Sequence, residues 1–290
     1  MTLPDSLHDV VISGFGEISS VSPSGGGSIN RAAHVRLENG QSLFVKWNSA
    51  DLYDMFVVEE KGLNLLKQAD SGLRIPTPHV HDKVEQEHLS YLILEYLPGG
   101  RPSDSVDQKL GEGLAQLHQT KWDKYGLNHD NYIGRLPQYN TPHEQWLDFF
   151  INQRMEPQLK MATDSGLLSS RDRRQFESLY SVLPNLLSEE PPSLLHGDLW
   201  GGNQFPTDTG EPAIFDPAVY YGNREIELAF TYLFGGFGPG FYEAYQATWP
   251  LASGFEDRKD IYNLYPLLVH VNLFGSVYAG QVKRILSRFT

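Results

Sequence analysis

The sequence has 290 residues, enough for two lobes that each bury a hydrophobic core. Its net charge of −13 argues against nucleic acid or an anionic membrane as the main partner, because phosphate groups attract clustered Lys and Arg. The absence of cysteine excludes disulfides, thiolate zinc sites and cysteine nucleophiles, and it fits a cytoplasmic protein.

The sequence predicts neither a signal peptide nor a membrane span. Residues 1–5 lack the basic stretch and apolar run of a signal peptide. The most apolar candidate, residues 264–277, is too short to cross a bilayer and is interrupted by Pro266, His270 and Asn272. A cytoplasmic location is therefore expected.

The first third of the chain predicts strands around one helix. Strands are expected over residues 18–22, 31–37, 42–47 and 91–97. Asn39-Gly40 suits a two-residue hairpin turn between the second and third of them. Apolar residues at helical spacing predict a helix over residues 51–67.

The rest of the chain predicts mainly helices. Leu110, Leu114 and Leu117 share one helix face, and helical periodicity recurs over residues 146–161 and 171–187. Two short strands carrying Asp198 and Asp216 follow, and helices continue to the end. The predicted fold class is α+β, with a small β-rich lobe over residues 1–97 and a larger, mainly helical lobe over residues 98–290.

Three polar residues predict phosphotransfer chemistry. Asp198 lies five residues before Asn203, and Asp216 follows the apolar run 213–215. In kinase-like enzymes one carboxylate accepts the proton of the attacking hydroxyl, while an Asn and a second carboxylate hold magnesium against the nucleotide phosphates. A solvated turn would explain each residue singly but not the ordered set. The architecture and this motif together predict a two-lobed, protein-kinase-like fold.

The β-rich lobe offers partners for a nucleotide. Gly25, Gly26, Gly27 and Ser28 lie between two strands, where backbone amides can approach phosphate oxygens. Three glycines are also common in a flexible turn, and no Gly-Lys-Ser/Thr follows, which excludes a Walker-type loop.

Lys46 at the end of a strand is the candidate ligand of the phosphates. Of Glu59 and Glu60 on the following helix only one can face it, because helical neighbours point about 100° apart, and we favour Glu59. Glu95 and Leu97 flank the segment between the lobes, where backbone groups could bind adenine.

With these residues established, the chain resembles the fructosamine kinase (ketosamine-3-kinase) family, relatives of aminoglycoside and choline kinases. The resemblance is nearly end to end and rests mainly on the segments 196–203 (HGDLWGGN), 216–225 (DPAVYYGNRE) and 233–237 (LFGGF). Further support comes from segments 44–46, 129–134, 241–245 and 249–251.

The resemblance implies an ATP-dependent kinase that phosphorylates the 3-hydroxyl of ketosamines, such as fructosamine, ribulosamine or erythrulosamine adducts. The unstable product implies a role in deglycation. It further implies that Asp198 is the base, that Asn203 and Asp216 bind Mg²⁺, and that Lys46 paired with Glu59 orients the phosphates.

Other residues carry expectations of lower specificity. His196 is expected to be structural. Gly197 stands where many protein kinases have an Arg that binds a phosphorylated activation segment, which argues against such regulation, and with the short segment after Asp216 this favours a small-molecule substrate. Asn223 stands where the family resemblance predicts Asp, which leaves the local cap or substrate contact open. The candidates for substrate contacts, among which core packing is the more common role for aromatics other than Trp200, are Trp200, Asn131, Tyr132, Gln138, Asn140 and Tyr220.

Two rival hypotheses remain open. The same chemistry could act on an aminoglycoside or on choline, although residues 232–249 lack the acidic cluster that a polycationic drug would favour. A nucleotide-binding pseudokinase is the other alternative, and it predicts loss of at least one of Lys46, Asp198, Asn203 and Asp216, all of which are present.

Overall fold

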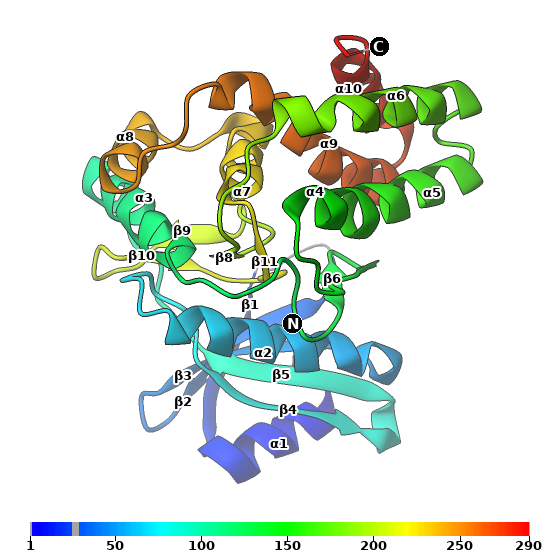
Figure 1. Ribbon diagram of the computed structural model, residues 1–290. Helices are drawn as coiled ribbons and strands as arrows, with labels where there is room; N and C mark the ends of the chain where they lie inside the picture. The colour runs from blue at the N-terminus through cyan, green and yellow to red at the C-terminus, as the bar shows by residue number, and fades with distance from the viewer. Residues whose placement is uncertain (1, 25–28, 290) are drawn as a thin grey trace.

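The β-rich N-terminal lobe is built on a five-stranded antiparallel sheet. The computed structural model describes residues 2–24 and 29–289, and Figure 1 shows the sheet below the helical lobe. The strands lie in the order β1-β2-β3-β5-β4. Their bounds are β1 (Ile18–Pro23), β2 (Arg31–Leu37), β3 (Ser42–Ser49), β4 (Pro78–Val84) and β5 (Leu89–Glu95).

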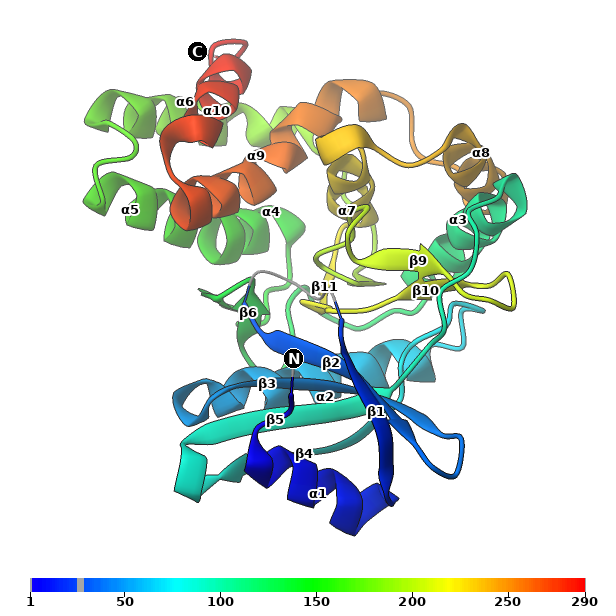
Figure 2. The same ribbon diagram turned by 180° about the vertical axis from the view of Figure 1, so that it is seen from behind.

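The two faces of this sheet are covered by different helices. Helix α1 (Asp5–Phe15) places Leu7 and Val11 on the outer face, where they join a small core with alternating residues of β2 and β3. Helix α2 (Tyr53–Gln68) lies on the opposite face, between the sheet and the helical lobe (Figures 1 and 2). Its residues Phe56, Leu63 and Leu66 belong to the large core that extends into the C-terminal lobe.

Helix α2 also packs closely against the loop that follows Asp216. A side chain at Gly62 would place its Cβ 3.2 Å from Pro217 and 3.4 Å from Val219. This glycine therefore lets the helix that carries Glu59 approach the loop that carries Asp216.

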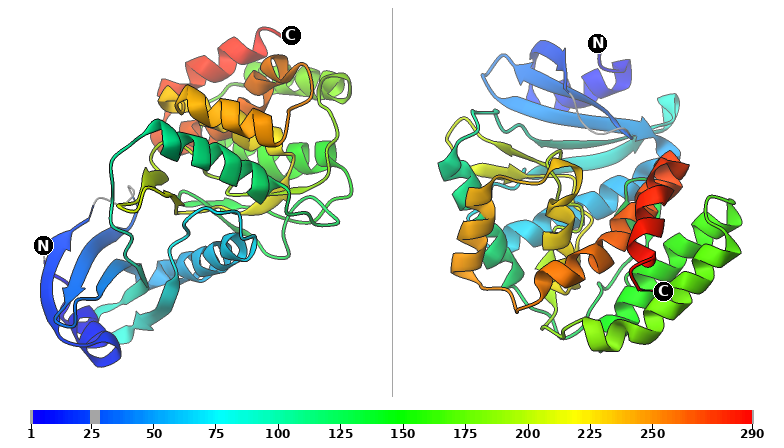
Figure 3. Two further views of the ribbon diagram at one scale, coloured as in Figure 1. Left: turned by 90° about the vertical axis from the view of Figure 1, so that its left-hand side faces the viewer. Right: turned by 90° about the horizontal axis from the view of Figure 1, so that it is seen from above.

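The C-terminal lobe is mainly helical. The segment between β5 and α3 contains residue 97, the predicted lobe boundary, and the views in Figure 3 show the two lobes on either side of it. The longer helices are α3 (Asp104–His118), α5 (Glu156–Asp164), α6 (Ser170–Leu186), α7 (Arg224–Thr231), α8 (Pro239–Thr248), α9 (Phe255–Phe274) and α10 (Ala279–Leu286). Short α4 (Trp146–Phe149) continues into α5 through the π-helical segment η3 (Phe150–Met155).

Three two-stranded antiparallel sheets face the N-terminal lobe, and loops next to their strands hold Asp198, Asn203 and Asp216. The pairs are β6 (Asn131–Ile133) with β7 (Leu136–Gln138), β8 (Ser193–Leu195) with β11 (Tyr220–Gly222), and β9 (Gln204–Pro206) with β10 (Pro212–Ile214). The sequence predicts two short strands that carry Asp198 and Asp216; the strands are β8 and β10, and the two residues lie in the loops that follow them.

No helix among the described residues is long and apolar enough to cross a membrane. The apolar stretch near residue 270 lies within α9, where Leu264, Leu268 and Val271 are buried in the large core. Its hydrophobicity is thus used for packing inside the lobe.

Burial of histidines makes the fold sensitive to acid. Burial lowers the pKa of six of them below 6.5: His34, His79, His118, His129, His196 and His270. The unfolded chain binds these protons more tightly, so stability is present above the unfolded pKa and is lost as the pH falls through it. We expect the urea midpoint to be lower at about pH 5.5 than at about pH 7.5; an equal or higher midpoint at the lower pH would contradict this.

Candidate active site

Asp198 lies in a tight loop whose shape depends on Gly197. Gly197 has φ +85°, and a Cβ there would lie 2.0 Å from the carbonyl oxygen of Ala218. Both constraints select glycine, so an Arg at this position is sterically excluded. The Asn203 side chain then donates from Nδ2 to the Asp198 carboxylate (3.0 Å) and to its carbonyl oxygen (2.9 Å), which fixes the side chain that the sequence predicts as the base.

The same loop is held from behind by Glu227 of α7. Its carboxylate accepts the backbone N–H groups of His196 (3.0 Å) and Gly197 (2.6 Å) and contacts His118 Nε2 (2.9 Å). Glu227 is buried, which by itself raises its pKa, but the hydrogen bond from His118 and the neighbouring donors outweigh burial and lower it. The backbone of the loop is therefore held by hydrogen bonds to a buried, ionised carboxylate.

His196 has a structural role in this geometry, as the sequence predicts. It is fully buried, and its Nε2 contacts the carbonyl oxygen of Phe215 (2.9 Å), while its own carbonyl accepts the N–H of Ala218 (2.9 Å). These bonds tie the Asp198 loop to the segment around Asp216.

Lys46 joins the two lobes. Its Nζ lies 2.7 Å from Glu59 Oε1 and 2.7 Å from Asp216 Oδ1, so β3, α2 and the loop after β10 meet at one ammonium group. Glu60 points elsewhere and contacts His81 at 2.6 Å. The pairing of Lys46 with Glu59 rather than Glu60 is the one expected from the sequence.

Burial and neighbouring charges shift the pKa values of Lys46 and Asp198. Burial lowers the pKa of Lys46, but Asp216 and Glu59 outweigh it and raise the pKa overall. Burial and then the Asp216 carboxylate raise the pKa of Asp198. Asp216 itself has φ +55°, a conformation that is uncommon outside glycine and is often found at functional sites.

A cleft of about 450 Å³ collects these residues. Its lining includes Lys46, Glu59, Asp198, Trp200, Asn203 and Asp216. Trp200 is 39% exposed, and its ring fills the space in which a side chain at Gly202 would place its Cβ, 2.3 Å away. Residues predicted from four separate segments thus meet in one cleft.

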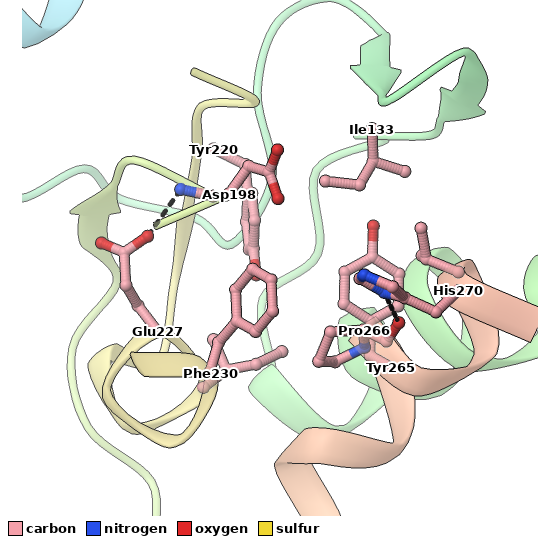
Figure 4. Close-up of a pocket in the computed structure, with 11 residues that line it drawn as sticks. Ile133, Asp198, Tyr220, Glu227, Phe230, Tyr265, Pro266 and His270 are labelled. Carbon is pink, nitrogen blue, oxygen red and sulfur yellow. Dashed lines mark hydrogen bonds between the residues drawn. The ribbon is translucent and has the colours of Figure 1, made fainter. Parts of the chain in front are cut away.

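A smaller, mostly apolar cavity adjoins Asp198. Figure 4 shows Asp198 and His270 on opposite sides of it, with Phe230 and Pro266 also at its wall. Tyr220, one of the candidate substrate residues, lines this cavity.

The other candidate substrate residues divide into two groups. Asn131 and Tyr132 line the larger cleft, whereas Gln138 and Asn140 lie buried behind it. Asn131 Oδ1 accepts from Gln138 Nε2 (2.7 Å) and Asn140 Nδ2 (3.0 Å). Asn131 and Gln138 also donate to the carbonyls of residues 219 and 218 (2.8 and 2.9 Å), so these amides support the loop after Asp216.

A buried arginine completes this support. Arg154, in the π-helical segment, donates to Asn140 Oδ1 (2.7 Å) and its guanidinium lies 3.8 Å from the ring centroid of Tyr220. Sequence reasoning missed Arg154 because the π-helical register that turns it inward departs from the α-helical period expected over residues 146–161.

The remaining predicted nucleotide ligands are placed as follows. Gly25, Gly26, Gly27 and Ser28 lie outside the described residues. Glu95 ends β5, and its carboxylate accepts from the N–H (3.1 Å) and hydroxyl (2.8 Å) of Thr77. Leu97, in the segment between β5 and α3, is buried.

Comparison with known proteins identifies the family. The family model described as fructosamine kinase matches residues 6–290. The chain belongs to the fructosamine kinase family, and it is a kinase, that is, a phosphotransferase.

Individual relatives support this membership. A probable ketoamine kinase of Enterococcus faecium is 35% identical over 100% of both chains. A chloroplastic protein-ribulosamine 3-kinase of Arabidopsis thaliana is 36% identical over 94% of this chain and 83% of its own.

Solved structures agree on the fold. A putative fructosamine-3-kinase from Thermobifida fusca is 32% identical, with a TM-score of 0.87 over 98% of this chain and 99% of its own. The choline kinase of Streptococcus pneumoniae is only 13% identical but has a TM-score of 0.65 over 98% and 99% of the two chains. The α+β, two-lobed kinase-like fold predicted from the sequence is thereby confirmed.

Proposed function

We propose that this kinase transfers the γ-phosphoryl group of ATP to the 3-hydroxyl of a ketosamine, with Asp198 as the base. The observation that carries the proposal is the meeting of Asp198, Asn203, Asp216 and Lys46 in one cleft of about 450 Å³. The names of the relatives, ketoamine kinase and ribulosamine 3-kinase, supply the acceptor class.

The donor set fits Mg²⁺. Asn203 uses its Nδ2 to hold Asp198, which leaves its Oδ1 for a cation, and Asp216 adds a carboxylate. Mg²⁺ prefers oxygen ligands and retains several waters, so one amide and one carboxylate suffice. Bound there, it would neutralise charge on the nucleotide phosphates.

The protein side chains perform the remaining tasks. Asp198 accepts the proton of the sugar hydroxyl, and Glu227 keeps its loop in position through the backbone of residues 196 and 197. Its raised pKa makes Asp198 a stronger base than an exposed aspartate. Lys46, oriented by Glu59, contacts the phosphates.

The test is ATP consumption by the purified protein with ribulosyl-lysine, erythrulosyl-lysine, fructosyl-lysine, kanamycin and choline as separate acceptors. We expect turnover with at least one ketosamine, and the best of the three identifies the sugar. Turnover confined to kanamycin or choline would overturn the acceptor class, and the absence of turnover with all five would favour the pseudokinase hypothesis.

Replacing Asp216 by Ala tests the metal site. We expect Asp216→Ala to weaken magnesium-dependent ATP binding, because it removes the carboxylate beside Lys46. The measurement is a titration of nucleotide binding against Mg²⁺, with Asp208→Ala, an exposed aspartate in the β9–β10 turn, as the control. An unaltered Mg²⁺ dependence would remove Asp216 from the site.

A further inference from the structure

Phe234 is an aromatic residue held in an unfavourable backbone conformation. It has φ +56° and ψ +38°, in the left-handed region, and its side chain is 42% exposed. A bulky residue seldom adopts this conformation, and the strain persists only where surrounding structure maintains it. The strain presents a large apolar ring at the surface instead of burying it.

Phe234 belongs to an aromatic rim formed with His270, Phe274 and Tyr278. The ring centroid of His270 lies 4.5 Å from that of Phe234, 5.5 Å from that of Phe274 and 5.0 Å from that of Tyr278. Phe274 is 53% exposed. An exposed cluster of aromatic rings of this kind marks a binding surface more often than a packing defect.

The rim is continuous with the proposed acceptor site. His270 lines both the small cavity beside Asp198 and the larger cleft, and Phe274 lines the larger cleft. Figure 4 shows the His270 ring facing the cavity across from Asp198. A molecule whose hydroxyl reaches Asp198 would therefore extend toward the rim.

His270 is suited to lie beside a cation. Its Nδ1 contacts the carbonyl oxygen of Pro266 at 2.7 Å, so in the neutral ring this nitrogen donates and Nε2 keeps a lone pair. Burial lowers the pKa of His270, which keeps the ring uncharged near neutral pH. A neutral imidazole can thus accept a hydrogen bond from an ammonium group.

The chemistry of a ketosamine supplies such a group. Its amine is attached to C1, two carbons from the C3 that bears the reacting hydroxyl, and a secondary alkylamine is protonated at neutral pH. The faces of aromatic rings attract ammonium ions through their quadrupoles.

We propose that Phe234, His270, Phe274 and Tyr278 form a subsite for the protonated amine half of the ketosamine. The subsite selects ketosamines over neutral sugars, and it receives the alkyl chain that carries the amine. This inference rests on the proposed function, because it assumes that a ketosamine hydroxyl reaches Asp198.

The test compares two acceptors that share the best ketose of the panel: one joined to hexylamine through nitrogen, the other to hexanol through oxygen. The first carries a charged amine and the second is a neutral ether. We expect Phe234→Ala and Phe274→Ala each to raise KM about tenfold for the amine and much less for the ether, with KM for ATP unchanged. Tyr139→Ala, which removes another exposed aromatic residue (45%) outside the rim, serves as the control.

The outcomes separate the two ideas. If the wild-type enzyme phosphorylates neither ketosamine nor ether, the proposed function fails and this inference fails with it. If it phosphorylates both with equal KM, or if the two variants change KM equally for the amine and the ether, the function stands and the amine subsite is wrong. Phe274 lies at the end of α9 and is not strained, so its variant tests the subsite even if Phe234→Ala rearranges its loop.

Discussion

Asp198→Asn is expected to lower turnover by about 10²–10⁴-fold, the usual contribution of general base catalysis. The amide is isosteric with the carboxylate but cannot accept the proton of the sugar hydroxyl. The loop should keep its shape, because Gly197 and the Glu227 carboxylate act on the backbone and not on the Asp198 side chain. The measurement is kcat with the best ketosamine of the panel.

Nucleotide binding separates loss of the base from loss of the fold. We expect Asp198→Asn to bind a non-hydrolysable ATP analogue with nearly unchanged affinity in a calorimetric titration. Asp208→Asn, an exposed substitution of the same type, should behave like the wild type. Near-normal kcat in Asp198→Asn would show that another group accepts the proton.

The second large effect is expected at Glu227. Glu227→Gln replaces a buried carboxylate that accepts two backbone N–H groups and contacts His118. Hydrogen bonds to a charged acceptor are worth about 1.5–3 kcal/mol each, so the free energy of unfolding should fall by about 3 kcal/mol. Turnover should fall as well, on the order of 10²-fold, because the base is displaced from the hydroxyl.

Urea unfolding and steady-state kinetics check the two parts of this prediction. Glu243→Gln on the exposed side of α8 is the matched control and should change stability by less than about 0.5 kcal/mol. A Glu227→Gln enzyme with unchanged stability and kcat would show that the loop is held by other contacts.

The spacing of residues in the sequence predicted the polar residues of the cleft, but it predicted less well the elements that surround the cleft. Lys46 is recognisable near the end of a strand, and Asp198, Asn203 and Asp216 by their spacing after strands and turns; the structure brings all four together. Helix geometry predicted that only one of Glu59 and Glu60 can face Lys46, and the favoured residue, Glu59, is the one that contacts it. The catalytic and metal-binding roles of these residues remain predictions.

Elements that lack a strong hydrophobic pattern were not predicted from the sequence. Strand β4 reads Pro-His-Val-His-Asp-Lys-Val and lies at the edge of the sheet with no buried residue, so it lacks the apolar alternation of a half-buried strand. Helix α1 buries only Leu7 and Val11. The two-stranded sheets beside the cleft have strands of three residues, too short for a period to be recognised.

The residues that support the site were missed for a different reason. Glu227 and Arg154 contact backbone groups, and His118 contacts the Glu227 carboxylate, all far away in the sequence, and no local spacing connects these residues. Glu227 left one signal, an acidic residue between the apolar Ile226 and Leu228 of a helix that is buried throughout. A charge in such a position requires internal partners.

Asn223 shows how a single departure from a family pattern can be accommodated. It caps α7 by accepting the N–H of Glu225 (3.0 Å), a bond that Asp would also make. Its Nδ2 also donates to the carbonyl oxygen of Ser188 (2.9 Å), which a carboxylate could not do. The difference thus affects the anchoring of the segment before β8 and leaves the cleft residues in place.

The position of Trp200 gives the protein an internal optical probe. Of its five tryptophans, Trp47 and Trp146 are almost fully buried, Trp122 and Trp249 are partly buried, and only Trp200 is exposed, at the edge of the cleft. Because indole emission responds to solvent, an acceptor that covers this ring should shift or quench the fluorescence without any coupled assay. The early events of sugar binding could then be followed by stopped-flow before any phosphate is transferred.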